Sequence, residues 1–109
     1  MKHLYGEFSK EQIKSTKEYL RKRIFFLLVC VDPNTSRGLE HVNINDCFRG
    51  LLYKISGLNK LLMEPQELVT ALSLLQAAQT EYNNPDFEFK NFKMLVLEAG
   101  AEVGKIKEV

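Results

Sequence analysis

The 109-residue chain has no tryptophan, and it contains only two histidines, two cysteines and three prolines. Neither His3 nor His41 stands at metal-ligand spacing from another histidine or from a cysteine, so the sequence lacks the paired ligands of a zinc site. It also lacks a glycine-rich phosphate loop, because Gly100 and Gly104 fall within a predicted helix instead of following a strand. We therefore expect no catalytic residue, no metal site and no cofactor.

The apolar run 24–31 is too short for a membrane span, since it has eight residues and a spanning helix needs about 20. It begins far from Met1, and no small-residue cleavage site follows it, which argues against a secretory signal. These absences predict a cytoplasmic protein. A helix that is apolar on every side has to be buried on every side, so the run predicts a fully enclosed core segment.

The composition is typical of one compact domain over residues 1–109, with 45% hydrophobic and 27% charged residues. Cys30 and Cys47 both lie within apolar patterns of a chain that has no export signal. This setting favours buried thiols over a disulfide.

Apolar residues recur at helical spacing in four segments, residues 10–31, 46–62, 65–82 and a last segment that begins after a cap at Asp86. Prolines and turn formers separate these segments, and the connection between the first two is the longest. This order predicts an all-α fold, an antiparallel four-helix bundle with a long loop between helices 1 and 2.

Cap signals indicate where two of these helices begin. Ser9 followed by Gln12 fits a capping box, and Phe8 with Ile13 fits a hydrophobic staple. We expect Asn45 to cap the second helix.

Small residues predict places where helices approach closely. Gly50 and Gly57 lie seven residues apart on one face of the second helix, where each costs about 1 kcal/mol relative to alanine. Four more small residues lie on the last helix and fit either internal packing or a dimer contact, namely Ala99, Gly100, Ala101 and Gly104. We expect self-association as a homodimer.

The charge is unevenly distributed along a chain whose net charge is +1. Residues 1–23 carry seven basic and three acidic side chains, whereas the remainder carries eight basic and eleven acidic ones. The basic face of the first helix consists of Lys10, Lys14, Lys17, Arg21 and Lys22. It fits an anionic partner or simply a solvated surface. Only Tyr19 is interleaved with these cations, so binding of nucleic acid is not expected.

The densest polar set of the chain lies in the long loop and at the start of the second helix. Binding residues are often presented on loops over a rigid scaffold, so we take this set as the candidate binding site. Its members are Asp32, Asn34, Arg37, Glu40, His41, Asn45, Asp46 and Arg49. Arg37 and Arg49 are the expected anchors, because guanidinium groups bind carboxylates and phosphates in a fixed geometry. The alternative is that these residues act as caps, turn formers and local ion pairs.

Acidic side chains permit a second hypothesis, a small all-helical nucleotide hydrolase or nucleotide-binding protein that uses a divalent metal. Glu64 and Glu67 are three residues apart, as such a helical metal site requires. The second cluster of such a site is missing, because Glu81, Asp86 and Glu88 straddle a predicted helix break.

In size and helical order the whole chain resembles the small bacteriocin immunity proteins of Gram-positive bacteria, although it shares no motif with them. This resemblance implies an immunity-type or regulatory protein and assigns no site residue. The leading hypothesis is therefore a non-enzymatic protein-interaction module with an unknown protein partner.

Overall fold

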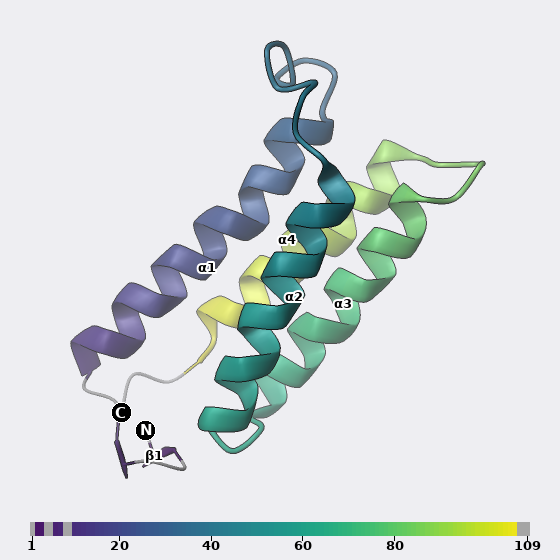
Figure 1. The fold of residues 1–109 in the computed structure, drawn as a ribbon. Coiled ribbons are helices and arrows are strands. Elements are labelled where there is room, and N and C mark those ends of the chain that lie inside the picture. Colours follow the sequence, from purple (N-terminus) through teal and green to yellow (C-terminus); the bar gives the residue numbers. More distant parts are fainter. Residues whose placement is uncertain (1, 4–5, 8–9, 107–109) are drawn as a thin grey trace.

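The computed structural model describes residues 2–3, 6–7 and 10–106. These residues form a bundle of four helices, preceded by a short pair of antiparallel strands (Figure 1). The elements are β1 (Lys2–His3), β2 (Gly6–Glu7), α1 (Lys10–Val31), α2 (Ile44–Leu61), α3 (Gln66–Tyr82) and α4 (Phe89–Gly104). The predicted antiparallel four-helix bundle is confirmed, including its long loop between the first two helices. The strand pair is a feature that the sequence analysis does not anticipate.

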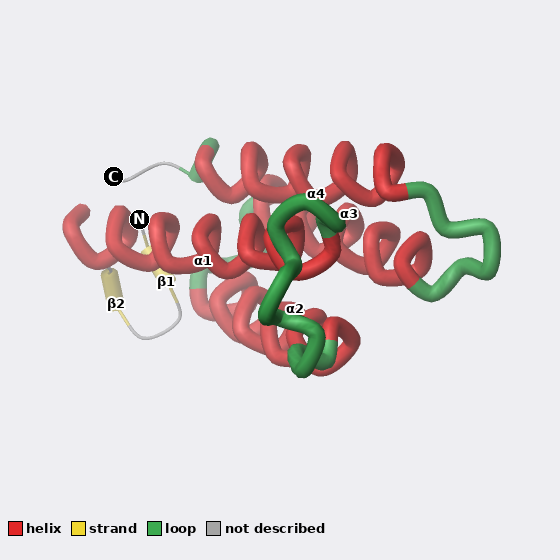
Figure 2. Tube along the Cα trace, turned by 90° about the horizontal axis from the view of Figure 1, so that it is seen from above, coloured by secondary structure: helices red, strands yellow, loops and turns green. Residues whose placement is uncertain are grey.

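Successive helices run in opposite directions, and each helix packs on two neighbours (Figure 1). The contact between α3 and α4 is the most extensive, followed by α1 on α4 and α2 on α3, while α1 and α2 touch the least. Loop 32–43 crosses from the end of α1 to the start of α2, as the view from above shows (Figure 2). The side of the bundle between α1 and α2 is therefore its least tightly closed one.

Two of the expected helix caps are wrong. Asn43 caps α2, because its Oδ1 accepts a hydrogen bond from the backbone N–H of Asp46, and Asn45 points elsewhere. The helix α4 begins later than expected, and the cap position before it is held by Glu88, whose side chain makes no capping hydrogen bond. Asp86 lies outside that helix. The expected capping box and hydrophobic staple lie outside the described residues, since both depend on residues 8 and 9.

The core receives apolar side chains from every helix at helical spacing; α3, for example, buries Leu68, Ala71, Leu75 and Ala78. An aromatic cluster fixes the end of the bundle where α3 turns into α4. The ring of Phe92 is buried there, and the centres of the Phe48, Tyr82 and Phe87 rings lie 5.9 to 6.2 Å from its own. Such edge-on and tilted arrangements are favourable for aromatic pairs.

Of the small residues on α4, Gly100 takes part in packing within the chain. A Cβ atom at this buried position would lie 2.5 Å from the Phe25 ring of α1, so only glycine allows this approach. Gly104 faces the Arg21 side chain, also from α1. The prediction that Gly50 and Gly57 let another helix approach α2 closely is wrong within the chain. Both glycines are exposed, and a Cβ atom added at either position would have no other atom within 4 Å.

The apolar run at the end of α1 is only partly enclosed, which corrects the expectation of burial on every side. Ile24 and Leu27 are buried, but Phe26 is half-buried outside the core cluster and Val29 is 39% exposed. The reason is geometric: among the helices that the structure describes, α4 and α2 are the ones that pack closely on α1, and they leave its outer side uncovered. Among the described residues, none of the helices combines the length and the hydropathy needed to cross a membrane.

Candidate functional site

The loop part of the predicted site is organised by local hydrogen bonds. Asp32 Oδ1 accepts from the backbone N–H of Asn34 at 2.9 Å, which closes an Asx turn directly after α1. Thr35 Oγ1 donates to the carbonyl of Val29 at 2.9 Å and so binds the loop back to the helix end. Gly38 has a φ of 86°, a conformation that side chains rarely adopt. Asp32 and Asn34 therefore shape the loop.

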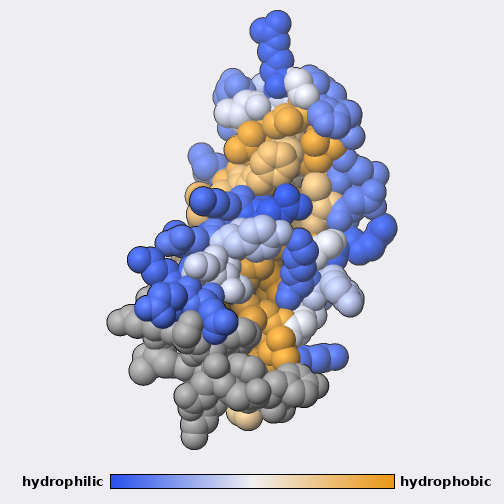
Figure 3. Space-filling view, turned by 60° about the vertical axis from the view of Figure 1, so that its left-hand side comes forward, coloured by the Kyte–Doolittle hydropathy of each residue, from blue (hydrophilic) through white to orange (hydrophobic). Residues whose placement is uncertain are grey.

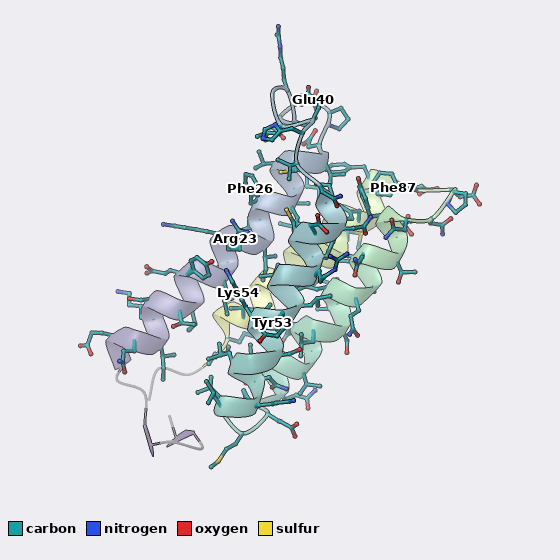
Figure 4. All side chains as sticks on the ribbon, in the orientation of Figure 1. Arg23, Phe26, Glu40, Tyr53, Lys54 and Phe87 are labelled. Atoms are coloured by element: carbon teal, nitrogen blue, oxygen red, sulfur yellow. The ribbon has the colours of Figure 1, made fainter. Side chains whose placement is uncertain are left out.

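The tip of the loop carries the next three predicted residues, Arg37, Glu40 and His41, and all three are exposed. Glu40 lies at the far end of the molecule from the α2–α3 turn (Figure 4). Its carboxylate accepts backbone hydrogen bonds from Glu40 itself and from Gly38, and these lower the pKa of Glu40. Glu40 is thus an ionised part of the loop, with Arg37 and His41 beside it in the sequence.

Asn45 turns away from the loop and joins the end of α3. Its Oδ1 accepts from Gln79 Nε2 at 3.2 Å and from Asn83 Nδ2 at 2.8 Å, while its Nδ2 donates to Asn83 Oδ1 at 3.0 Å. These hydrogen bonds join the start of α2 to the end of α3, between residues that are 34 to 38 positions apart in the chain. We call these three residues, Asn45, Gln79 and Asn83, the amide cluster. Its hydrogen bonds hold the start of α2 against the end of α3.

The last two predicted residues pair with each other. Arg49 Nη1 lies 3.0 Å from Asp46 Oδ1, one turn earlier on α2, and both side chains are largely exposed. The predicted site is thus divided among the loop, the amide cluster and this ion pair. Arg49, an expected anchor, already has a local partner.

The acidic residues considered for a metal site lie in different parts of the bundle and do not form one cluster. Glu81 Oε1 accepts from the backbone N–H of Glu88 at 3.0 Å and braces the α3–α4 turn. Glu64 is exposed, with a φ of 55°, in the turn between α2 and α3, and Glu67 is half-buried in the first turn of α3. Among the described residues, no three histidine, cysteine or acidic side chains come together as a metal site would require.

The cysteines are free, as expected, and each is half-buried. Burial, and secondarily the proximity of Cys47, raises the pKa of the Cys30 thiol. A raised pKa keeps the thiol protonated near neutral pH and lowers its nucleophilicity.

A group of exposed and half-buried side chains on α1 and α2 was not identified from the sequence. We call it the α1–α2 face and define it by Tyr19, Arg23, Phe26 and Val29 of α1 together with Tyr53 and Lys54 of α2. Tyr53 is 81% exposed and Tyr19 46%. Tyr19, Arg23 and Phe26 follow one another at helical spacing, so they occupy one side of α1.

The positions of these side chains can be followed in two views. Phe26, Arg23, Lys54 and Tyr53 succeed one another along the α1 and α2 side of the bundle (Figure 4). The space-filling view from the α1 side shows apolar surface in two areas, separated by a band of hydrophilic side chains (Figure 3).

Lys54 connects the two helices of this face. Its Nζ donates a hydrogen bond to the hydroxyl of Tyr19 at 2.6 Å and lies 5.1 Å from the centre of the Tyr19 ring. The hydrogen bond from Lys54 is the main cause that lowers the pKa of Tyr19, and the charges of Lys54 and Arg23 act in the same direction.

An open depression on α2 continues the α1–α2 face. Its lining includes Tyr53 and Lys54 themselves and, one to two turns later, Gly57, Lys60 and Leu61. Among the described residues that line it, two are lysines and none is acidic.

The basic face predicted for α1 is partly structural. Lys17 is half-buried, and its Nζ donates to the carbonyl of Ile106 at 2.6 Å, which ties α1 to the segment after α4. The Arg21 guanidinium lies 5.5 Å from the centre of the Phe25 ring. Lys14 and Lys22 are exposed.

Comparison of the chain with known protein families, with curated proteins and with solved structures finds no match.

Proposed function

We propose that this chain is a non-enzymatic protein-interaction module that binds its partner through the α1–α2 face. The observation that carries the proposal is the placement of Tyr53, Tyr19, Phe26 and Val29 at the surface of two adjacent helices. Apolar and aromatic side chains left at the surface beside polar ones, here in two areas divided by a hydrophilic band, are typical of interaction sites.

The residue types support the same proposal. Tyrosine, phenylalanine and arginine are enriched at the centres of protein interfaces, where they contribute most of the binding energy. Arg23 stands between Tyr19 and Phe26 on α1, and Tyr53 stands out from α2. Other exposed apolar residues exist, such as Met94 and Leu97 of α4, but no exposed aromatic side chain lies within four residues of either on that helix.

The experiment is site-specific photo-crosslinking in cells that produce the protein natively. A benzophenone amino acid replaces Tyr53 or Phe26, and a matched variant carries it in place of Met94, which is 53% exposed on α4. We expect a discrete crosslinked species from positions 53 and 26 and none from position 94. Crosslinking from position 94 alone, or from Arg37 in the loop, would place the binding surface elsewhere.

The same experiment addresses the homodimer. Self-association was expected from the small residues of α4, and Gly100 is occupied by packing against Phe25 within the chain. A homodimer would therefore have no contact at Gly100. Its crosslinked product would have twice the mass of the chain and would contain only its peptides.

A further inference from the structure

We infer that the partner segment of the α1–α2 face is an acidic amphipathic helix. This inference rests on the proposed function and adds to it the chemistry of the bound segment. The geometry fits a helix because α1 and α2 lie side by side with their least mutual contact, and an amphipathic helix packs well against two such helices.

The charge of the two helices calls for an acidic partner. The helix α1 carries six basic and two acidic residues and α2 three basic and one acidic, whereas α3 carries two acidic residues and no basic one. Two of the cations lie on the α1–α2 face itself. Lys54 binds the uncharged hydroxyl of Tyr19, and Arg23 pairs with no carboxylate among the described residues. Carboxylates from a partner would give both cations a counter-ion.

The apolar component favours a protein over a nucleic acid. Phe26 and Val29 on α1 and Leu61 beside the depression on α2 offer contacts to aliphatic side chains. A single-stranded nucleic acid would stack bases on Tyr19, Phe26 and Tyr53, but it has no aliphatic side chains to cover Val29 and Leu61. Gly57 also favours close packing of a partner helix, because it lines the depression on α2. The space that a Cβ atom would occupy there is open, with no other atom within 4 Å.

The probes are three synthetic helical peptides of about 18 residues, or five helical turns, with the same leucine stripe. They differ only in the residues flanking the stripe, which are glutamate, glutamine or lysine. We expect the glutamate peptide to bind the full-length protein roughly tenfold more tightly than the glutamine peptide, and the lysine peptide not to bind. Fluorescence anisotropy at low and at physiological salt measures the three affinities.

Two double variants test the location. Arg23→Glu with Lys54→Glu should reverse the preference, so that the lysine peptide becomes the tighter ligand. Lys90→Glu with Lys93→Glu changes the net charge equally at exposed positions of α4 and should leave the preference unchanged. Circular dichroism checks whether both variants fold.

Several outcomes would overturn the inference. These are equal binding of the glutamate and lysine peptides, no binding of the glutamate peptide, an equal effect of both double variants, or preferential binding of an oligothymidylate probe. The proposed function fails separately. If crosslinking from position 53 identifies a protein partner while the glutamate peptide does not bind, the interaction surface stands and its acidic-helix partner does not.

Discussion

Lys54 of α2 donates a hydrogen bond to the hydroxyl of Tyr19 of α1 at 2.6 Å and lies 5.1 Å from the centre of its ring. This contact joins α1 to α2, the pair of neighbouring helices that touch each other least in the bundle. It also holds a cation at the surface, next to the 81% exposed Tyr53. The contact therefore bears on both the packing and the proposed binding of this side of the molecule.

The first prediction concerns the ionisation of Tyr19. The Lys54 hydrogen bond lowers its pKa below 10.0, so Lys54→Met should move the titration of one tyrosine to higher pH. Because the folded pKa is the lower one, ionisation of Tyr19 favours the folded state. The contribution of Tyr19 to the free energy of unfolding is fully present above the pKa that this tyrosine has in the unfolded chain. It is lost as the pH falls through the lower pKa that Tyr19 has in the folded protein. NMR of ring-labelled tyrosine measures the shift, and Tyr19→Phe identifies the signal.

The second prediction separates neighbouring positions of the apolar run. Leu27 is 1% exposed, so Leu27→Ala should cost about 2 to 5 kcal/mol of unfolding free energy, as truncations in a core do. Phe26 lies half-exposed outside the core cluster, and Phe26→Ala should cost roughly 1 kcal/mol, near the average for substitutions. Urea unfolding measures both. Equal losses would mean that Phe26 is enclosed in the same core as Leu27.

The third prediction compares two glycines. Gly100→Ala places a Cβ 2.5 Å from the Phe25 ring and should lower stability by about 1 kcal/mol or more, since overpacking outweighs the gain in helix propensity. Gly50→Ala is the matched control, because it meets no atom within 4 Å and should raise stability by about 0.5 to 1 kcal/mol. Thermal and urea unfolding report the signs, and two substitutions of the same sign would contradict the packing of α1 on α4.

The helices were predictable because their signals are local. Asp32-Pro33 ends α1, Pro65 precedes α3, and the helical repeat of apolar residues identifies the buried side of each segment. The cap of α2 was not predictable in this way. Asn43 and Asn45 are both good cap residues, and the choice depends on Asn83, which binds Asn45 from 38 residues away.

The α1–α2 face was missed for a similar physical reason. On α1 alone, Tyr19 is a single aromatic residue among cations, and the apolar run predicts burial. The surface exists because folding brings Tyr53 and Lys54 next to α1, and Lys54 is 35 residues away from Tyr19 in the sequence. The number of neighbours that cover α1 also depends on the whole bundle, which no local pattern encodes.

The fourth prediction tests the corrected cap. Asn43→Ala removes the hydrogen bond to the N–H of Asp46 and should cost about 0.5 to 2 kcal/mol, the usual range for a lost cap. Asn45→Ala should cost less, about 0.5 to 1 kcal/mol, because Gln79 and Asn83 have access to water as a replacement partner. Urea unfolding of the two variants ranks them. The opposite order would mean that the amide cluster, and not the cap, secures the start of α2.

The fifth prediction decides between the loop and the α1–α2 face as the binding surface. Arg37 is exposed, and Arg49 forms only an exposed ion pair with Asp46, which contributes little to stability. Replacing both arginines by alanine should therefore leave the melting temperature nearly unchanged. If the partner binds the α1–α2 face, crosslinking from position 53 should persist in this double variant. Its loss without a change in melting temperature would instead assign partner binding to the predicted loop site, with Arg37 and Arg49 as anchors.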